Sequence, residues 1–112
     1  MAKQYSYKFK EAAIALFLDI IQKINRKNKN KYYKFFQNEL RLSPKEFETI
    51  KINILKEKNI KKEIQVIKEE LEFSQYNIMS FLMILNRCII LDGCELDSYQ
   101  KFEEIRDGLL RK

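Results

Sequence analysis

The sequence predicts an all-α fold, a compact single-domain helical bundle of about six helices that takes up residues 1–112. Its length of 112 residues fits one domain. Helix-breaking residues are rare, with only two Gly and one Pro, and the rest of the composition favours helix. Apolar residues recur at intervals of three and four, and no stretch shows the strict alternation of a β-strand.

The first helix is expected over Tyr5–Asn25, where one face is apolar and Asp19 falls on the opposite, solvent side. The run Asn25–Lys31 contains no apolar residue, so we expect a solvated loop there. A short second helix follows over Lys31–Leu40. The side chains expected to face inward in the second helix are Tyr32, Phe35, Phe36 and Leu40.

The clearest helix start lies at Ser43. Its hydroxyl can accept from the backbone N–H of Glu46, and the Glu46 carboxylate can reach back to the N–H of Ser43. Pro44 takes the first helical position, where its missing N–H costs nothing. Leu42 is placed to pack against Phe47. The sequence therefore predicts a third helix that begins after Ser43 and fades near residues 57–59.

A fourth helix is expected over Ile60–Leu71, and a fifth over Gln75–Leu91 with Ser74 as its N-cap. Apolar residues cover nearly the whole circumference of the fifth helix, and Ser80 and Arg87 trace one narrow polar line. This distribution predicts a buried central helix near residues 75–91. Its longest apolar stretch is about 14 residues, against the roughly 20 that a bilayer requires, so we expect no membrane span.

The turn Asp92-Gly93 is expected to end the fifth helix, since glycine readily adopts the left-handed conformation of a helix C-terminus. Asp97 is then predicted to cap the sixth helix, with Gln100 as its capping-box partner. The inward-facing side chains of this helix are Phe102, Ile105 and Leu109.

The order of these helices, with the motifs Leu40–Phe47, Phe73-Ser74 and Asp92–Asp97, resembles the TerB-like domains, named for a tellurite-resistance protein. The resemblance covers most of the chain. It implies a helical bundle with an internal pseudo-repeat and two acidic loops that have been considered a cation site. It also implies an accessory or interaction domain, in some members linked to stress responses, with no established reaction.

The first half departs from that pattern, because Asn25–Lys31 carries four positive charges where the family has carboxylates. In the second half Asp92, Glu95 and Asp97 remain as the candidate metal ligands. A divalent cation needs about six oxygen ligands, so we interpret these residues as part of a capped turn. If the two loops lie at the same end of the bundle, they could instead pair with each other, at about 0–1 kcal/mol per pair.

No catalytic group is evident, and we predict that the chain is not an enzyme and needs no cofactor. Histidine, the commonest general base, is absent. Cys88 lies in an apolar run that disfavours its thiolate, and Cys94 has acidic neighbours that do the same. Two cysteines form no disulfide framework, and no signal peptide precedes them, so a reducing cytoplasm is the expected location.

Two kinds of partner are compatible with the sequence. An unidentified protein is favoured, with a candidate contact patch formed by aromatic residues and nearby lysines; the alternative is that these aromatic rings pack beneath the first helix. The second partner is nucleic acid, bound without sequence specificity, because residues 1–62 carry a net charge of +10 and residues 63–112 a net charge of −4. Lysine outnumbers arginine 17 to 5, which an AT-rich genome would also produce. The residues of the candidate patch are Tyr32, Tyr33, Phe36, Lys27, Lys29 and Lys31.

Overall fold

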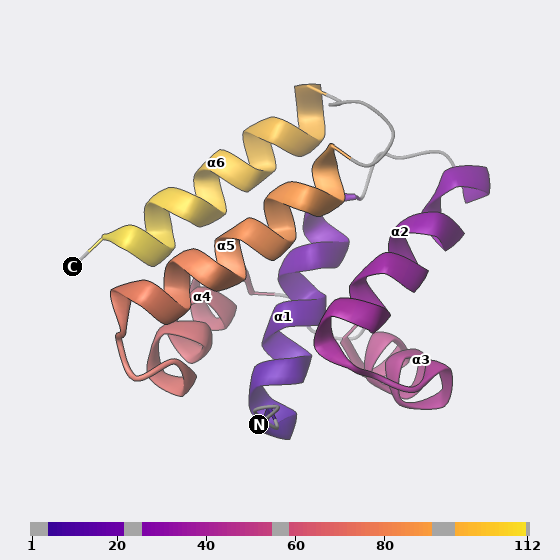
Figure 1. The fold of residues 1–112 in the computed structure, drawn as a ribbon, viewed down its shortest axis with the longest axis horizontal. Helices are drawn as coiled ribbons and strands as arrows, with labels where there is room; N and C mark the ends of the chain where they lie inside the picture. Colours follow the sequence, from indigo (N-terminus) through magenta and orange to yellow (C-terminus); the bar gives the residue numbers. More distant parts are fainter. Residues whose placement is uncertain (1–4, 22–25, 55–58, 91–95, 112) are drawn as a thin grey trace.

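The computed structural model describes residues 5–21, 26–54, 59–90 and 96–111, with no description of the side chains of residues 26–29 and 96–98. These segments form helices joined by turns and contain no strand, which confirms the predicted all-α fold (Figure 1). The radius of gyration is 13.0 Å, close to the roughly 13 Å expected for one compact domain of this size. The helices are α1 (Tyr7–Ile20), α2 (Arg26–Leu40), α3 (Pro44–Ile54), α4 (Ile60–Glu70), α5 (Gln75–Ile89) and α6 (Leu96–Leu110).

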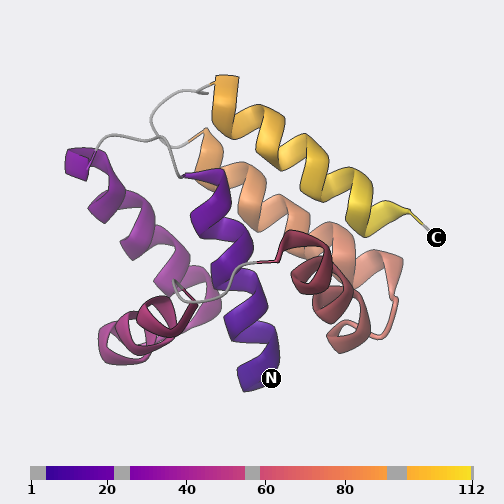
Figure 2. The same ribbon diagram turned by 180° about the vertical axis from the view of Figure 1, so that it is seen from behind.

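Helix α1 occupies the centre of the bundle. It contacts α3, α4 and α6, and α2 and α4 lie on opposite sides of it in both views (Figures 1 and 2). Helices α5 and α6 run side by side in opposite directions on the face that is nearer the viewer in Figure 1. Helices α3 and α4 lie nearer the viewer in Figure 2, which shows the opposite face.

The burial pattern of α1 corrects the prediction that the helix near residues 75–91 is the central one. Every residue from Ala12 to Phe17 is buried, together with Phe9 and Ile20. Three of these residues, Ala12, Ala13 and Ala15, have side chains of a single methyl group. Small side chains allow neighbouring helices to approach α1 closely, so α1 is covered on most of its sides.

Asp19 also differs from the prediction, since it is buried instead of lying on a solvent face. Its carboxylate lies 3.8 Å from Nζ of Lys101 on α6. Asp19 stands in the last turn of α1, where the helix dipole disfavours a negative charge. The lysine from α6 offsets that cost and ties the end of α1 to α6.

The N-terminus of α2 lies earlier in the chain than predicted. The helix begins at Arg26, so the run predicted to be a solvated loop is helical from that residue onward. Lysine and asparagine can occupy a helix as long as their side chains reach water, and the buried rings of Tyr32 and Phe36 hold the later turns against the core. The absence of apolar residues was therefore a poor indicator of a loop.

The last helix also starts earlier than predicted. Helix α6 begins at Leu96, which places Asp97 inside the first helical turn and not at the N-cap. Asp92-Gly93, the predicted end of α5, lies outside the described residues. The described part of α5 ends at Ile89, with Ile90 as its C-cap.

In the described part of the chain, side chains cap the N-termini of four helices, two of them as predicted. Ser43 accepts from the backbone N–H of Glu46 at 3.1 Å, and Ser74 accepts from the N–H of Asn77 at 3.3 Å. In addition, the hydroxyl of Ser6 caps α1 and the side chain of Asn59 caps α4.

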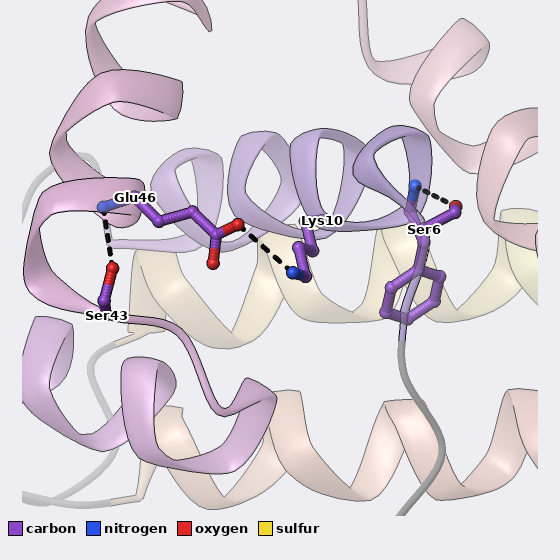
Figure 3. Close-up of polar contacts among 5 residues, drawn as sticks. Ser6, Lys10, Ser43 and Glu46 are labelled. Carbon is purple, nitrogen blue, oxygen red and sulfur yellow. Dashed lines mark hydrogen bonds and ion pairs between the residues drawn. The ribbon is translucent and has the colours of Figure 1, made fainter.

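The carboxylate of Glu46 does not complete the capping box that the sequence predicts. Its Oε2 lies 3.2 Å from Nζ of Lys10, in the second turn of α1 (Figure 3). Only the folded chain brings this lysine within reach. The predicted local contact is therefore replaced by an ion pair between α1 and α3.

Candidate interaction surface

The aromatic residues predicted to contact a partner belong mainly to the core. Tyr32 and Phe36 are buried, and Tyr33 is half-buried. The rings of Phe36 and Phe17 stack with centroids 4.2 Å apart. The ring of Tyr33 lies T-shaped to Phe17, with centroids 6.2 Å apart, and tilted to Phe47, with centroids 5.4 Å apart. Tyr32 and Phe36 are therefore not available as the predicted contact residues, because a partner cannot reach rings that are already buried in the core.

The described lysines of the first half are distributed over several helices. Lys31 is exposed on α2, whereas the side chains of Lys27 and Lys29 lie outside the described part. Exposed lysines occur on α2 and on α4, and α1 lies between these two helices (Figures 1 and 2). Nucleic-acid binding therefore stays a prediction from charge alone.

The acidic residues considered as metal ligands fall largely outside the described part of the chain, so the structure does not test them as a site. Asp92 and Glu95 lie outside the described residues, and only the backbone of Asp97 is described, in the first turn of α6. Among the described side chains, no group of three acidic or cysteine residues is arranged to hold a metal ion.

Cys88 has the properties of a structural thiol. It is fully buried on the inner side of α5. Burial raises the pKa of the Cys88 thiol to about 12, and the negative charge of Glu39 adds to this effect against the opposing charge of Arg87. The thiolate needed for nucleophilic attack is therefore disfavoured at neutral pH. Cys94 lies outside the described residues.

A different surface stands out, formed by the outward side of α5. Of the nine large apolar or aromatic side chains exposed in the described part of the chain, five lie within residues 73–90. Tyr76 is 81% exposed, Met83 59%, Ile90 54% and Met79 47%. We define the outer face of α5 as these four side chains together with the exposed polar residues between them, Ser80, Asn86 and Arg87.

The spacing of the outer face matches a coiled-coil seam. Tyr76, Met83 and Ile90 follow at intervals of seven, and Met79 and Asn86 each stand three residues after one of them. Positions a and d of a heptad repeat have this 3.5-residue spacing and pack against a partner helix. The inner side of α5 packs on the core through a separate set of residues: Ile78, Phe81, Leu82, Leu85, Cys88 and Ile89.

Neighbouring helices define the flanks of the outer face. On one side Arg87 pairs with Glu39 of α2, with 3.4 Å between guanidinium nitrogen and carboxylate oxygen. On the other side α6 runs alongside and exposes Tyr99 and Leu110 in part. Arg87 is the only charged residue of α5 itself. Depletion of charge together with enrichment of aromatic residues and Met is typical of the centre of a protein–protein interface.

The turn before α5 carries strained backbone next to a small groove. Glu72 and Phe73 have φ values of 57° and 55°, a left-handed conformation that is uncommon for large side chains. The N–H of Phe73 donates to the carbonyl of Lys68, and that of Glu72 to the carbonyl of Glu69, as in a Schellman motif. Phe73 is 63% exposed and lines a cavity of about 330 Å³ with Lys68, Gln75, Ile78, Leu109, Leu110 and Arg111. The groove lies at the N-terminal end of α5, between this turn and the C-terminal end of α6.

The sequence contained the signal for this face, but the composition of the helix hid it. Because apolar residues surround almost all of α5, the prediction assigned every side to the core except the narrow polar line of Ser80 and Arg87. Ser80 and Arg87 are exposed as predicted, and the exposed side is broader than the narrow line they trace. The seven-residue spacing of Tyr76, Met83 and Ile90 would have indicated a second, separate seam.

In the described segments, the structure contains no helix with the length and hydropathy needed to cross a membrane. Comparison of the chain with known protein families, with curated proteins and with solved structures found no match.

Proposed function

We propose that this chain is a non-enzymatic interaction domain whose protein partner packs a helix onto the outer face of α5. The exposure of Tyr76, Met79, Met83 and Ile90 in one heptad register supports this proposal. Monomeric proteins rarely leave large contiguous apolar surfaces in water, and such surfaces commonly mark binding sites. A helix laid on this face would bury apolar area at about 25 cal/mol per Å².

The absence of histidine from the sequence and the burial of Cys88 argue in the same direction. The cysteine cannot act as a nucleophile while its thiol is protonated and shielded from solvent. Binding, and not catalysis, is what the outer face of α5 is suited to do.

We also propose a TerB-like type for this domain and, with it, a role linked to stress responses in the cytoplasm. The support is the order of the helices and the Ser43-Pro44 entry into α3. The turn Asp92-Gly93, the other main motif, lies outside the described residues.

The binding proposal is tested by affinity co-purification with the wild-type chain and with Met83→Glu as baits. A charge at the centre of the seam should remove the partner, because the carboxylate would be buried without a counter-ion. Ile52→Glu is the matched control, since Ile52 on α3 has a similar exposed fraction of 56%. A partner identified in this way must also bind the purified wild-type chain, and Met83→Glu should weaken that affinity at least about 10-fold. If Met83→Glu and wild type retain the same proteins with equal affinity, the proposal is wrong.

A further inference from the structure

We infer that the helix that packs onto the outer face of α5 is α5 of a second copy of this chain, in antiparallel orientation. This inference rests on the proposed function and names the partner. A two-fold dimer requires a surface that is complementary to itself. The residues along the outer face meet this requirement when the two-fold axis passes through Met83.

Self-complementarity appears when the positions of α5 are paired across a two-fold axis through Met83. Residues at equal distances on either side of position 83 then face each other. Tyr76 faces Ile90 of the second copy, and Met83 faces itself, so apolar contacts lie at the centre and at both ends. Between them, Ser80 faces Asn86 of the second copy, and both side chains can donate and accept hydrogen bonds.

The remaining pair joins Met79 to Arg87 of the second copy. The guanidinium of Arg87 already lies 3.4 Å from a carboxylate oxygen of Glu39 in its own chain. Its aliphatic stem can therefore cover Met79 while the charge stays paired at the edge. No residue of the outer face has to bury an unpaired charge in this arrangement.

Charge also favours the antiparallel over the parallel orientation. In a parallel pair the two Arg87 side chains would stand at the same level and repel each other. In the antiparallel pair they stand four positions above and below the axis, or about 12 Å apart at 1.5 Å per residue. That separation exceeds the Debye length of about 8 Å at physiological ionic strength.

The size of the surface sets the expected strength of the dimer. Helices α5 and α6 each have 15 residues, so each is about 22 Å long and about 10 Å wide. Because α6 packs beside α5 and exposes Tyr99 and Leu110, we count both helices as the upper bound of the interface. Together they cover roughly 450 Å² per copy, or about 900 Å² for both, which is in the range of weak, transient interfaces. The net charge of +6 per copy opposes association further. The dimer should therefore form reversibly in the range of about 10 µM to 1 mM.

Sedimentation velocity of the purified full chain over this concentration range tests the inference. Wild type and Ile52→Glu should show a sedimentation coefficient that rises with concentration. Met83→Glu and Met83→Lys should each remain monomeric, since two like charges would meet on the axis. An equimolar mixture of Met83→Glu and Met83→Lys should recover the dimer, because opposite charges then face each other.

Cysteine cross-linking then checks the orientation. Variants Tyr76→Cys and Ile90→Cys are made in a Cys94→Ser background, in which the remaining native cysteine, Cys88, is buried. After mild oxidation with copper phenanthroline, the mixture of the two variants should give a covalent dimer. Tyr76→Cys alone should not, because its two copies would stand about 21 Å apart.

Three outcomes would overturn the inference: a wild-type chain that stays monomeric throughout, a dimer that Met83→Glu leaves intact, or cross-linking of Tyr76→Cys to itself. A monomeric wild type whose binding to a different purified protein is lost in Met83→Glu would contradict only the second-copy inference. The proposed function would stand in that case, so the two failures can be told apart.

Discussion

Helices α1 and α5 are both rich in apolar residues, but they differ in how far the rest of the fold buries them. Helix α1 includes Lys8, Lys10, Glu11 and Asp19, yet it lies at the centre of the bundle. Helix α5 has Arg87 as its only charged residue, yet one side of it faces solvent.

The difference lies in the size and position of the side chains. The alanines of α1 allow three other helices to approach closely, and the charges of α1 sit at its ends or reach partners such as Glu46. The outer face of α5 carries long side chains that no described element covers. A high apolar content therefore predicts that a helix has an apolar surface. It does not predict whether other helices of the same chain bury that surface.

The largest contrast is expected between truncations on the two helices. Phe17 on α1 touches the rings of Phe36, Tyr33 and Phe47, so Phe17→Ala should lower the free energy of unfolding by about 3–5 kcal/mol. Met83→Ala on α5 should change it by less than about 0.5 kcal/mol, because an exposed side chain leaves no cavity. Urea denaturation followed by circular dichroism at low protein concentration measures both. Similar losses for the two variants would mean that α5 is as deeply packed as α1.

A second contrast compares substitutions that enlarge a side chain on each helix. Ala13 is fully buried in α1, so Ala13→Leu should destabilise the fold by about 1–3 kcal/mol through overpacking. Ser80→Leu, which enlarges the exposed side of α5, should be within about 0.5 kcal/mol of wild type. Thermal melting of the two variants in parallel gives the comparison. A tolerated Ala13→Leu would show that the helices around α1 are not closely packed.

The smallest effect concerns the contact between α1 and α4. Burial raises the pKa of Glu63 on α4, the carboxylate of Glu11 on α1 raises it further, and Lys62 opposes the shift. A raised pKa means that the folded state binds the proton more tightly than the unfolded state. This contribution to stability is therefore lost as the pH rises from 4.5, the ordinary value, through the raised pKa.

Glu63→Gln should accordingly raise the melting temperature at pH 7, and the gain should vanish below about pH 4.5, where the carboxyl is protonated in both states. Glu72→Gln, which removes the same charge from an exposed turn residue, is the control. Melting curves between pH 3.5 and 8 give the profile. A gain that is independent of pH, or that Glu72→Gln reproduces, would contradict the assigned cause.

Local signals in the sequence predicted most of the helices well. Ser43-Pro44 and Ser74 begin helices where predicted, because a hydroxyl cap acts on backbone N–H groups only a few residues away. The weakest boundaries were those of α2 and α6. Helix α2 extends back over a run of lysine and asparagine. These residues can occupy a helix when their side chains reach water, and the buried aromatic residues of the later turns hold the helix against the core.

The candidate surface was harder to predict than the fold. An aromatic contact patch was predicted because four aromatic residues in five positions cannot all face one narrow core stripe, which would leave Tyr33 or Phe36 exposed. The structure resolves this crowding by stacking Phe17 and Phe36 and by placing Tyr33 against Phe47. Sequence spacing could not reveal these contacts, because the residues come from three different helices.

The sequence by itself determined that the chain is helical, where several helices begin, and that histidine chemistry is absent. These properties depend on composition, on capping and on the 3.6-residue period, all of which act over a few neighbouring residues. Only the tertiary structure decided that α1 is the central helix and that the outer face of α5 is exposed. Burial depends on which other helices pack against each side, and this is set by contacts between residues far apart in the chain.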